Sequence, residues 1–111
     1  MLMPFTVFLT RDAENDLNEL FDYIARHDGP RKADHVLDQI EKAFARLSEF
    51  PARGAHPREL LALGIREYRE IFFKPYRIIY RIMEGNVYVL LIADGRRDMQ
   101  TLLQQRLIGR A

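Results

Sequence analysis

The chain of 111 residues contains no cysteine and no tryptophan, and Ser48 is its only serine. Without cysteine it can form no disulfide and offers no thiolate to a metal or a redox partner. Ser48 has no histidine or acidic residue at a spacing typical of a hydrolase triad. The three histidines, His27, His35 and His56, lie far apart and lack metal-ligand spacing. Gly95 stands alone rather than in a phosphate-binding glycine loop, so we predict no metal site, no cofactor and no catalytic residue.

Long apolar runs are also missing. No stretch approaches the roughly 20 apolar residues that a membrane-spanning helix needs. Residues 1–4 do not begin a basic segment followed by an apolar one, so no secretory signal is visible. We therefore expect a cytoplasmic protein with no membrane partner.

The formal net charge of +1 conceals an uneven distribution along the chain. Residues 1–65 carry 8 Lys/Arg against 11 Asp/Glu, whereas residues 66–111 carry 9 against 5. A chain close to neutral is a weak candidate for nonspecific nucleic-acid binding. The basic C-terminal part instead suits an acidic partner, which could be a protein segment or a phosphate backbone.

Apolar periodicity predicts an α+β fold. Residues 11–27 and 31–49 repeat apolar side chains at helical spacing and are interrupted at 28–30, which predicts a helical hairpin. Residues 5–9, 66–73, 76–83 and 87–93 read as strands, residues 52–64 as a loop with a short helical turn near 59–63, and residues 97–108 as a last helix. The order β-α-α-β-β-β-α predicts a small antiparallel sheet with the helical hairpin packed on one face.

Arginines interrupt the apolar strands, and their positions predict a binding surface. Alternation places Arg77 and Arg81 on one face of the strand 76–83, opposite the face that would pack under the helices. Arginines that follow the last strand can reach the same face, where their planar guanidinium groups suit carboxylate or phosphate. A single strand arginine is more often a solvated residue paired to a nearby glutamate. Several on one face favour a surface that binds a partner or faces a phosphate, formed by Arg69, Arg77, Arg81, Arg96 and Arg97.

Several segments of the chain, taken together in their order and spacing, resemble the RelE/ParE family of bacterial type II toxin–antitoxin toxins, and within it the ParE branch. The similarity covers nearly all of residues 5–98 and includes Glu49-Phe50-Pro51, Arg69-Glu70-Ile71, Pro75-Tyr76-Arg77-Ile78-Ile79-Tyr80-Arg81-Ile82 and Gly95-Arg96-Arg97-Asp98. We expect residues 1–111 to form one toxin domain, with a family core at 1–98 and a helical extension at 99–111. The fold that the resemblance implies agrees with the predicted element order.

The resemblance implies a growth-inhibiting toxin that is neutralised by a cognate antitoxin, ParD-like or of another class, encoded beside it. The antitoxin would carry a DNA-binding N-terminal part and a C-terminal segment that folds onto the toxin. ParE-type members block DNA gyrase and replication, whereas RelE-type members cut mRNA on the ribosome. A third alternative is a non-toxic relative that only binds its antitoxin. A homodimer and a toxin–antitoxin hetero-oligomer both stay open.

Chemistry favours the ParE-type reading. Cutting RNA through its 2′-hydroxyl needs groups that remove and donate protons as well as cations on the phosphate. RelE-like nucleases use lysines with a C-terminal tyrosine or histidine, but here no such residue follows Tyr88, and Lys74 is the only lysine after Lys42. Asp94, where many ParE-like sequences carry histidine, is expected to form a salt bridge with Arg96. We therefore predict a ParE-like toxin that contacts gyrase without chemistry of its own, with mRNA as a partner only under the RelE alternative.

Overall fold

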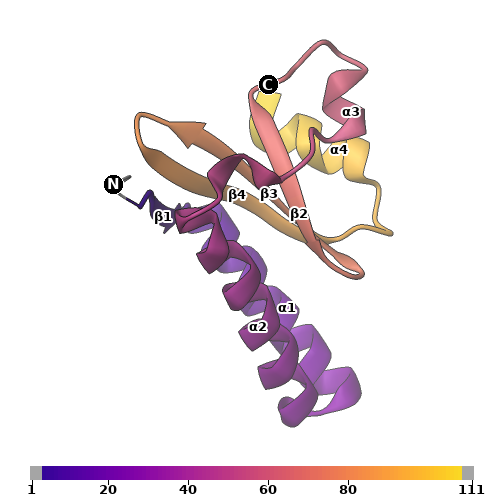
Figure 1. Ribbon diagram of the computed structural model, residues 1–111. Helices are drawn as coiled ribbons and strands as arrows, with labels where there is room; N and C mark the ends of the chain where they lie inside the picture. Colours follow the sequence, from indigo (N-terminus) through magenta and orange to yellow (C-terminus); the bar gives the residue numbers. More distant parts are fainter. Residues whose placement is uncertain (1–3, 109–111) are drawn as a thin grey trace.

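The structure is a computed structural model that describes residues 4–108. Two long helices, a four-stranded sheet and two short helices follow the predicted order (Figure 1). The elements are β1 (Thr6–Leu9), α1 (Arg11–Asp28), α2 (Pro30–Ala45), the 3-10 turns η1 (Arg46–Ser48) and η2 (Pro51–Arg53), α3 (Arg58–Leu61), β2 (Tyr68–Phe73), β3 (Tyr76–Met83), β4 (Asn86–Asp94), α4 (Met99–Leu103) and the π-helical turn η3 (Gln104–Ile108). Residues 109–111 of the predicted C-terminal extension lie outside the described residues.

The helical hairpin begins and ends at residues suited to those positions. The side chain of Thr10 accepts a hydrogen bond from the backbone N–H of Ala13, which caps α1. Gly29 has a φ of 94°, a left-handed conformation that glycine adopts without steric cost, and Pro30 opens α2 at the first helical turn. The second helix ends at Ala45, four residues before the predicted limit, and the chain continues as the 3-10 turn η1.

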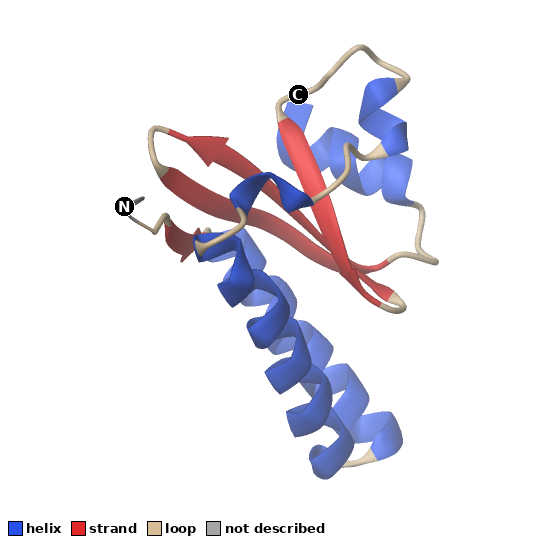
Figure 2. Ribbon diagram, viewed as in Figure 1, coloured by secondary structure: helices blue, strands red, loops and turns tan. Residues whose placement is uncertain are grey.

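The predicted antiparallel meander is confirmed for β2, β3 and β4, and the sheet order is β1-β4-β3-β2. The first strand joins β4 in parallel, with Val7 opposite Val87, so the whole sheet is mixed rather than purely antiparallel (Figure 2). Alternation within a strand does not reveal this pairing, because β1 reaches its partner only after the helical hairpin and the β2–β3 meander have intervened. The two edges of the sheet are therefore β1 and β2.

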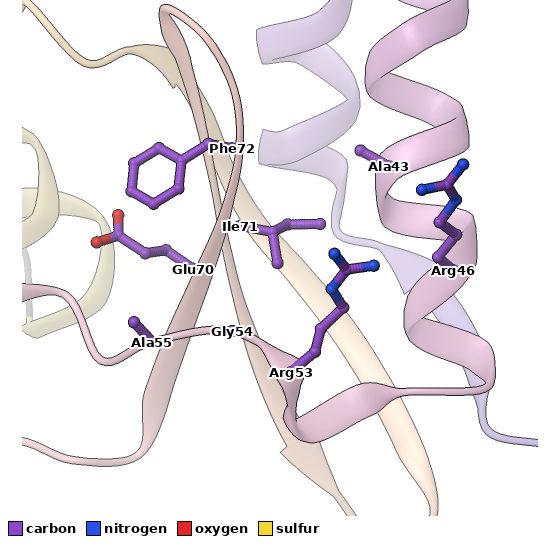
Figure 3. Close-up of a pocket in the computed structure, with 8 residues that line it drawn as sticks. All are labelled: Ala43, Arg46, Arg53, Gly54, Ala55, Glu70, Ile71 and Phe72. Carbon is purple, nitrogen blue, oxygen red and sulfur yellow. The ribbon is translucent and has the colours of Figure 1, made fainter.

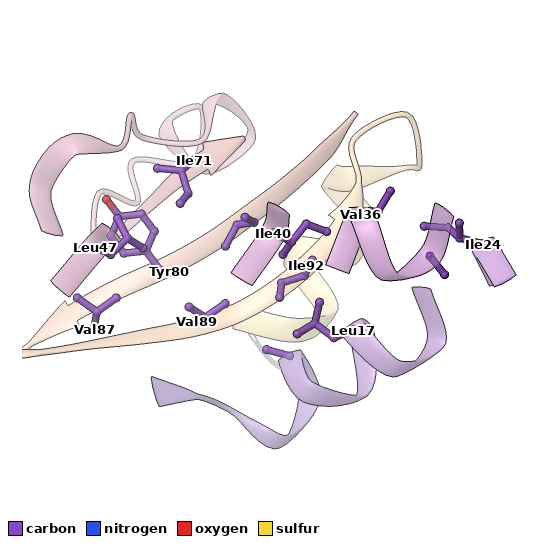
Figure 4. Packing of buried hydrophobic residues seen from close by; sticks show 13 residues of the cluster. Leu17, Ile24, Val36, Ile40, Leu47, Ile71, Tyr80, Val87, Val89 and Ile92 are labelled. Carbon is purple, nitrogen blue, oxygen red and sulfur yellow. The ribbon is translucent and has the colours of Figure 1, made fainter. Parts of the chain in front are cut away.

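The α1–α2 hairpin covers one face of the sheet and buries the larger apolar core. Val36 and Ile40 from α2 and Leu17 from α1 meet Tyr80, Val89 and other strand residues there (Figure 4). A leucine or isoleucine side chain fully buried in this way contributes about 1.5–3 kcal/mol relative to leaving it exposed.

A second, smaller core covers part of the opposite face. Ile79 and Leu91 from the sheet pack against Leu60 of α3 and Leu103 of α4. Arg106 attaches the C-terminal helical segment to α1, because its guanidinium donates to Asp16 at 2.9 and 3.0 Å and to the carbonyl of Leu90 at 2.8 Å. The predicted last helix therefore packs, through Met99 and Leu103, against the face on which the arginine surface was expected.

Candidate functional site

Arg77 lies on the predicted face of β3, but it is buried and fully paired. Its Nε donates to Glu70 at 2.7 Å, while its two terminal nitrogens donate to both carboxylate oxygens of Glu59 at 2.7 and 2.8 Å. Glu59 comes from α3 and Glu70 from β2, so this charged trio ties three elements together. Hydrogen bonding to Glu59 and Glu70 raises the pKa of Arg77, and the bond from Arg77 lowers the pKa of Glu59. Arg77 therefore offers no free guanidinium to a ligand.

Arg81 lies on the same face of β3 as Arg77, towards the other end of the strand. Its guanidinium carbon lies 5.8 Å from the centre of the Tyr68 ring. Between the two arginines, this face of the sheet is covered by the second core, which includes Ile79 and Leu91. The prediction that both lie on the face opposite the hairpin is confirmed. The expectation that they converge on one open surface is wrong, because α3 and α4 cover the middle of that face.

Arg69 lies on the opposite face of the sheet, the one that the helical hairpin covers. It pairs in register with Tyr80, whose ring belongs to the core under the hairpin, and directly opposed residues of antiparallel strands share a face. Its guanidinium donates to the backbone carbonyls of Ala52 at 3.2 Å and Gly54 at 2.8 Å. Arg69 thus holds the segment before α3 in place, and its predicted grouping with the other arginines is wrong.

Arg96 and Arg97 lie exposed on the turn after β4. The Nε of Arg96 donates to Asp94 at 2.9 Å, which confirms the expected salt bridge, and hydrogen bonding from Arg96 lowers the pKa of Asp94. Among residues 4–108, the side chain of Arg97 has no hydrogen-bond or ion-pair partner. Of the five predicted arginines, only these two lie together and open to solvent, and their contact with a partner stays a prediction.

The sequence reading missed a surface along the free edge of β2, where two grooves meet. One groove, of about 410 Å³, runs between β2 and the end of α2, and Figure 3 shows Arg46 and Arg53 on that side of the strand. The other, of about 510 Å³, lies on the opposite side of the strand. Both are lined by Glu70 and Phe72, and the Phe72 side chain is 51% exposed. We call the two grooves and the strand edge between them the β2-edge surface.

Cations without carboxylate partners line both grooves of the β2-edge surface. Arg46 and Arg53 line the first groove, and Arg58 and Lys74 line the second together with the paired Arg77 and Arg96. Among residues 4–108, none of the first four forms an ion pair. A solvent-exposed aromatic ring flanked by cations is suited to a partner that is both acidic and apolar.

The backbone of β2 adds hydrogen-bonding groups to this surface. Glu70 exchanges two backbone hydrogen bonds with Ala55, of 2.7 and 3.2 Å, on the side of β2 that faces away from β3. Strand residues two apart direct their N–H and C=O groups to the same side, so Phe72 also presents its backbone groups at the free edge. The sheet can therefore be extended by a partner strand beside Phe72.

His56 also lines the second groove, although its position in the sequence indicated no more than a loop residue. Its Nδ1 lies 3.0 Å from the carbonyl oxygen of Tyr68. The tautomer that donates this bond leaves Nε2 as a proton acceptor. Only the folding of the 52–57 segment onto β2 brings His56 near Lys74 and Arg96, which is why spacing along the chain gave no signal.

Within residues 4–108, no group of three or more histidine, aspartate or glutamate side chains is arranged to hold a metal ion. No helix in the same range combines the length and apolar character that a bilayer crossing requires.

Comparison with known proteins identifies the family. Residues 7–99 match the family described as the ParE toxin of the type II toxin–antitoxin system parDE. The chain is 33% identical over 100 residues to Toxin ParE3 of Caulobacter vibrioides, a match that covers 90% of this chain and 96% of the relative.

Solved structures agree with this relationship. A chain of the chromosomal ParDE system from P. aeruginosa superposes with a TM-score of 0.69 at 21% identity, covering 81% of this chain and 95% of that one. A chain of the toxin–antitoxin complex RelBE2 from Mycobacterium tuberculosis gives 0.56 at 30% identity, with 82% and 98% covered. A mutant of E. coli RelE in the free state gives 0.63 at 15% identity, with 90% and 93% covered. The chain therefore belongs to the ParE toxin family of type II toxin–antitoxin systems.

Proposed function

We propose that this toxin inhibits DNA gyrase through protein–protein contact, without chemistry of its own, and that its cognate antitoxin neutralises it by binding along the β2-edge surface. Both partners are cytoplasmic, so the toxin would act in that compartment. The exposed pair Arg96 and Arg97, beside the second groove, is the predicted contact with a partner.

The observation that carries the non-nuclease part of the proposal is the state of Arg77. A nuclease needs free cations where the negative charge of the scissile phosphate develops. Here the arginine that faces the groove is held by two carboxylates, and the trio of Arg77, Glu59 and Glu70 has a net charge of −1. Arg77 would therefore add no free positive charge to a phosphate that entered this groove, whereas a protein surface need not approach this point at all.

One feature favours a second function, cleavage of mRNA. The groove that contains Arg77 also contains His56, whose Nε2 can accept a proton, together with Lys74 and Arg96. A histidine with a neighbouring cation is a combination found in sites that cleave RNA by proton transfer. We rank it second because the buried arginine is already neutralised.

The decisive experiment measures supercoiling of relaxed plasmid by purified gyrase in the presence of the toxin. The proposal expects supercoiling to stop, and to resume when the antitoxin is added first. If gyrase keeps its activity while the toxin cleaves mRNA in a translating extract, the second function holds, and His56→Ala should then abolish cleavage. A toxin that affects neither gyrase nor mRNA and does not arrest growth would be the non-toxic relative.

The β2-edge surface is proposed for the antitoxin because its three components suit one kind of ligand. Exposed Phe72 offers apolar contact, Arg46 and Arg53 offer charge, and the strand edge offers backbone hydrogen bonds. An acidic, partly apolar segment that becomes ordered on binding would use all three, because coupled folding requires apolar burial as well as charge pairing.

Charge reversal tests this assignment. The double variant Arg46→Glu with Arg53→Glu should weaken antitoxin binding at least tenfold, measured by titration calorimetry. The matched control reverses two exposed cations at the far end of α2, Arg31→Glu with Lys32→Glu, and should bind like the unmodified toxin. Equal weakening by both pairs would indicate a general effect of net charge and would remove the β2-edge surface from the proposal.

A further inference from the structure

The other edge of the sheet, β1, leaves backbone groups available for pairing. The N–H of Thr10 donates to the carbonyl of Val89, so residues at even positions of this strand direct their backbone groups towards β4. At odd positions, the N–H of Phe5 donates outward to Ser48, and the Ser48 hydroxyl donates to the carbonyl of Phe5. By the same alternation, Val7 and Leu9 direct their N–H and C=O groups to the free edge.

An exposed aromatic patch lies beside this edge, on the face of the sheet opposite the hairpin. Phe8 is 44% exposed and stacks on Tyr88, with ring centres 5.4 Å apart. Met83, also exposed, and Tyr88 line a shallow hollow of about 170 Å³ with neighbouring residues of the sheet. Residues 5–10 contain no charged side chain and no proline, which are the usual devices that keep an edge strand from pairing.

We propose that a second copy of this chain pairs with β1 across a two-fold axis, joining the two sheets edge to edge. The axis passes beside Phe8, so Phe8 faces Phe8 of the second copy in a non-hydrogen-bonded pair. Val7 then exchanges two hydrogen bonds with Leu9 of the second copy, and Leu9 does the same with Val7, giving four in all. The stacked Tyr88 and Phe8 of each copy form one continuous row of four aromatic rings.

The β1 edge is self-complementary in this register. In this register residue numbers in a facing pair add up to sixteen, so residues 6–10 pair with residues 10–6 of the second copy, and none of them is charged. Aromatic cross-strand pairs stabilise antiparallel strands, and two-fold interfaces require such self-complementarity. The pairing leaves the β2 edge on the opposite side of each sheet free, so it does not depend on the proposed function.

Sedimentation equilibrium of the full chain tests the dimer. The unmodified chain should show a concentration-dependent monomer–dimer equilibrium. Phe8→Lys should be monomeric, because two lysines would face each other, whereas the matched control Thr6→Lys, on the same face of the same strand, should still dimerise because residue 6 faces Thr10. An equimolar mixture of Phe8→Lys and Phe8→Glu should dimerise again. A monomeric unmodified chain, or a Phe8→Lys chain that still dimerises, overturns the proposal.

Cysteine cross-linking gives a second measure that does not rely on charge repulsion. The chain has no cysteine, so Phe8→Cys introduces a single thiol. Facing residues in a non-hydrogen-bonded pair have Cα atoms about 4.5 Å apart, within disulfide range, whereas two Thr6→Cys thiols would be displaced by about 13 Å along the strands. Oxidation should therefore cross-link Phe8→Cys and not Thr6→Cys. Equal cross-linking of both, or of neither, overturns the proposed register.

Discussion

Removing the charge of Arg77 should be among the most destabilising single changes in this toxin. The substitution Arg77→Met keeps an unbranched apolar stem, which matters because this stem packs closely on Gly95, where an added Cβ would lie only 2.8 Å from Cδ of Arg77. It leaves the carboxylates of Glu59 and Glu70 without their shared partner, and both are largely buried. Breaking a buried ion pair by removing one partner costs about 3–5 kcal/mol.

Urea unfolding followed by circular dichroism measures this loss. With an m-value of about 1.5 kcal/mol per molar urea, the expected loss lowers the midpoint by about 2 to 3 M. The matched control is Arg96→Met, which breaks the ion pair between Arg96 and Asp94, in which the arginine side chain is 77% exposed. This control should leave the midpoint nearly unchanged, because exposed pairs are screened by solvent.

The pH dependence gives an independent check. The bond from Arg77 lowers the pKa of Glu59 from its ordinary value of 4.5. A group whose pKa is lowered by folding adds stability above its unfolded pKa and loses it as pH falls through its folded pKa. The difference between the unmodified toxin and Arg77→Met should therefore be large at neutral pH and shrink as the pH falls below about 4.5. Equal midpoints for Arg77→Met and Arg96→Met at neutral pH would refute the reasoning.

Three further predictions concern the elements that hold the site in place. Tyr80→Phe removes a buried hydroxyl that accepts the N–H of Gly54 at 3.0 Å, so it should cost about 1–3 kcal/mol in urea unfolding and accelerate amide exchange at Gly54. Gly54→Ala places a Cβ within 2.6 Å of the Glu70 carbonyl oxygen, so it should lower the thermal midpoint and disorder the β2-edge surface, measured by calorimetry and amide exchange. Arg106→Met breaks the contacts with Asp16, so amide exchange in 99–108 should rise while exchange in α1 changes little.

The predicted arginine surface shows where sequence reasoning reached its limit. Alternation placed Arg77 and Arg81 on the correct face of β3, because a strand fixes the direction of each side chain locally. It gave no information on what lies above that face. Glu59 is 18 residues from Arg77 in the chain, and α3 and α4 reach the sheet only through tertiary packing. The same reason explains why His56 and the β2-edge surface were missed.

The local pattern of apolar, β-branched and capping residues determined which elements form and in what order, because helix and strand periodicity are properties of neighbouring residues. Family membership also followed from sequence, since the motif around Pro75-Tyr76-Arg77 and Gly95-Arg96-Arg97 keeps its order and spacing. The parallel addition of β1, the neutralisation of Arg77 and the choice of free edges were decided only by the tertiary structure. Each depends on residues distant in the chain being brought into contact, and the free energy of burying a charge is set by its neighbours in space.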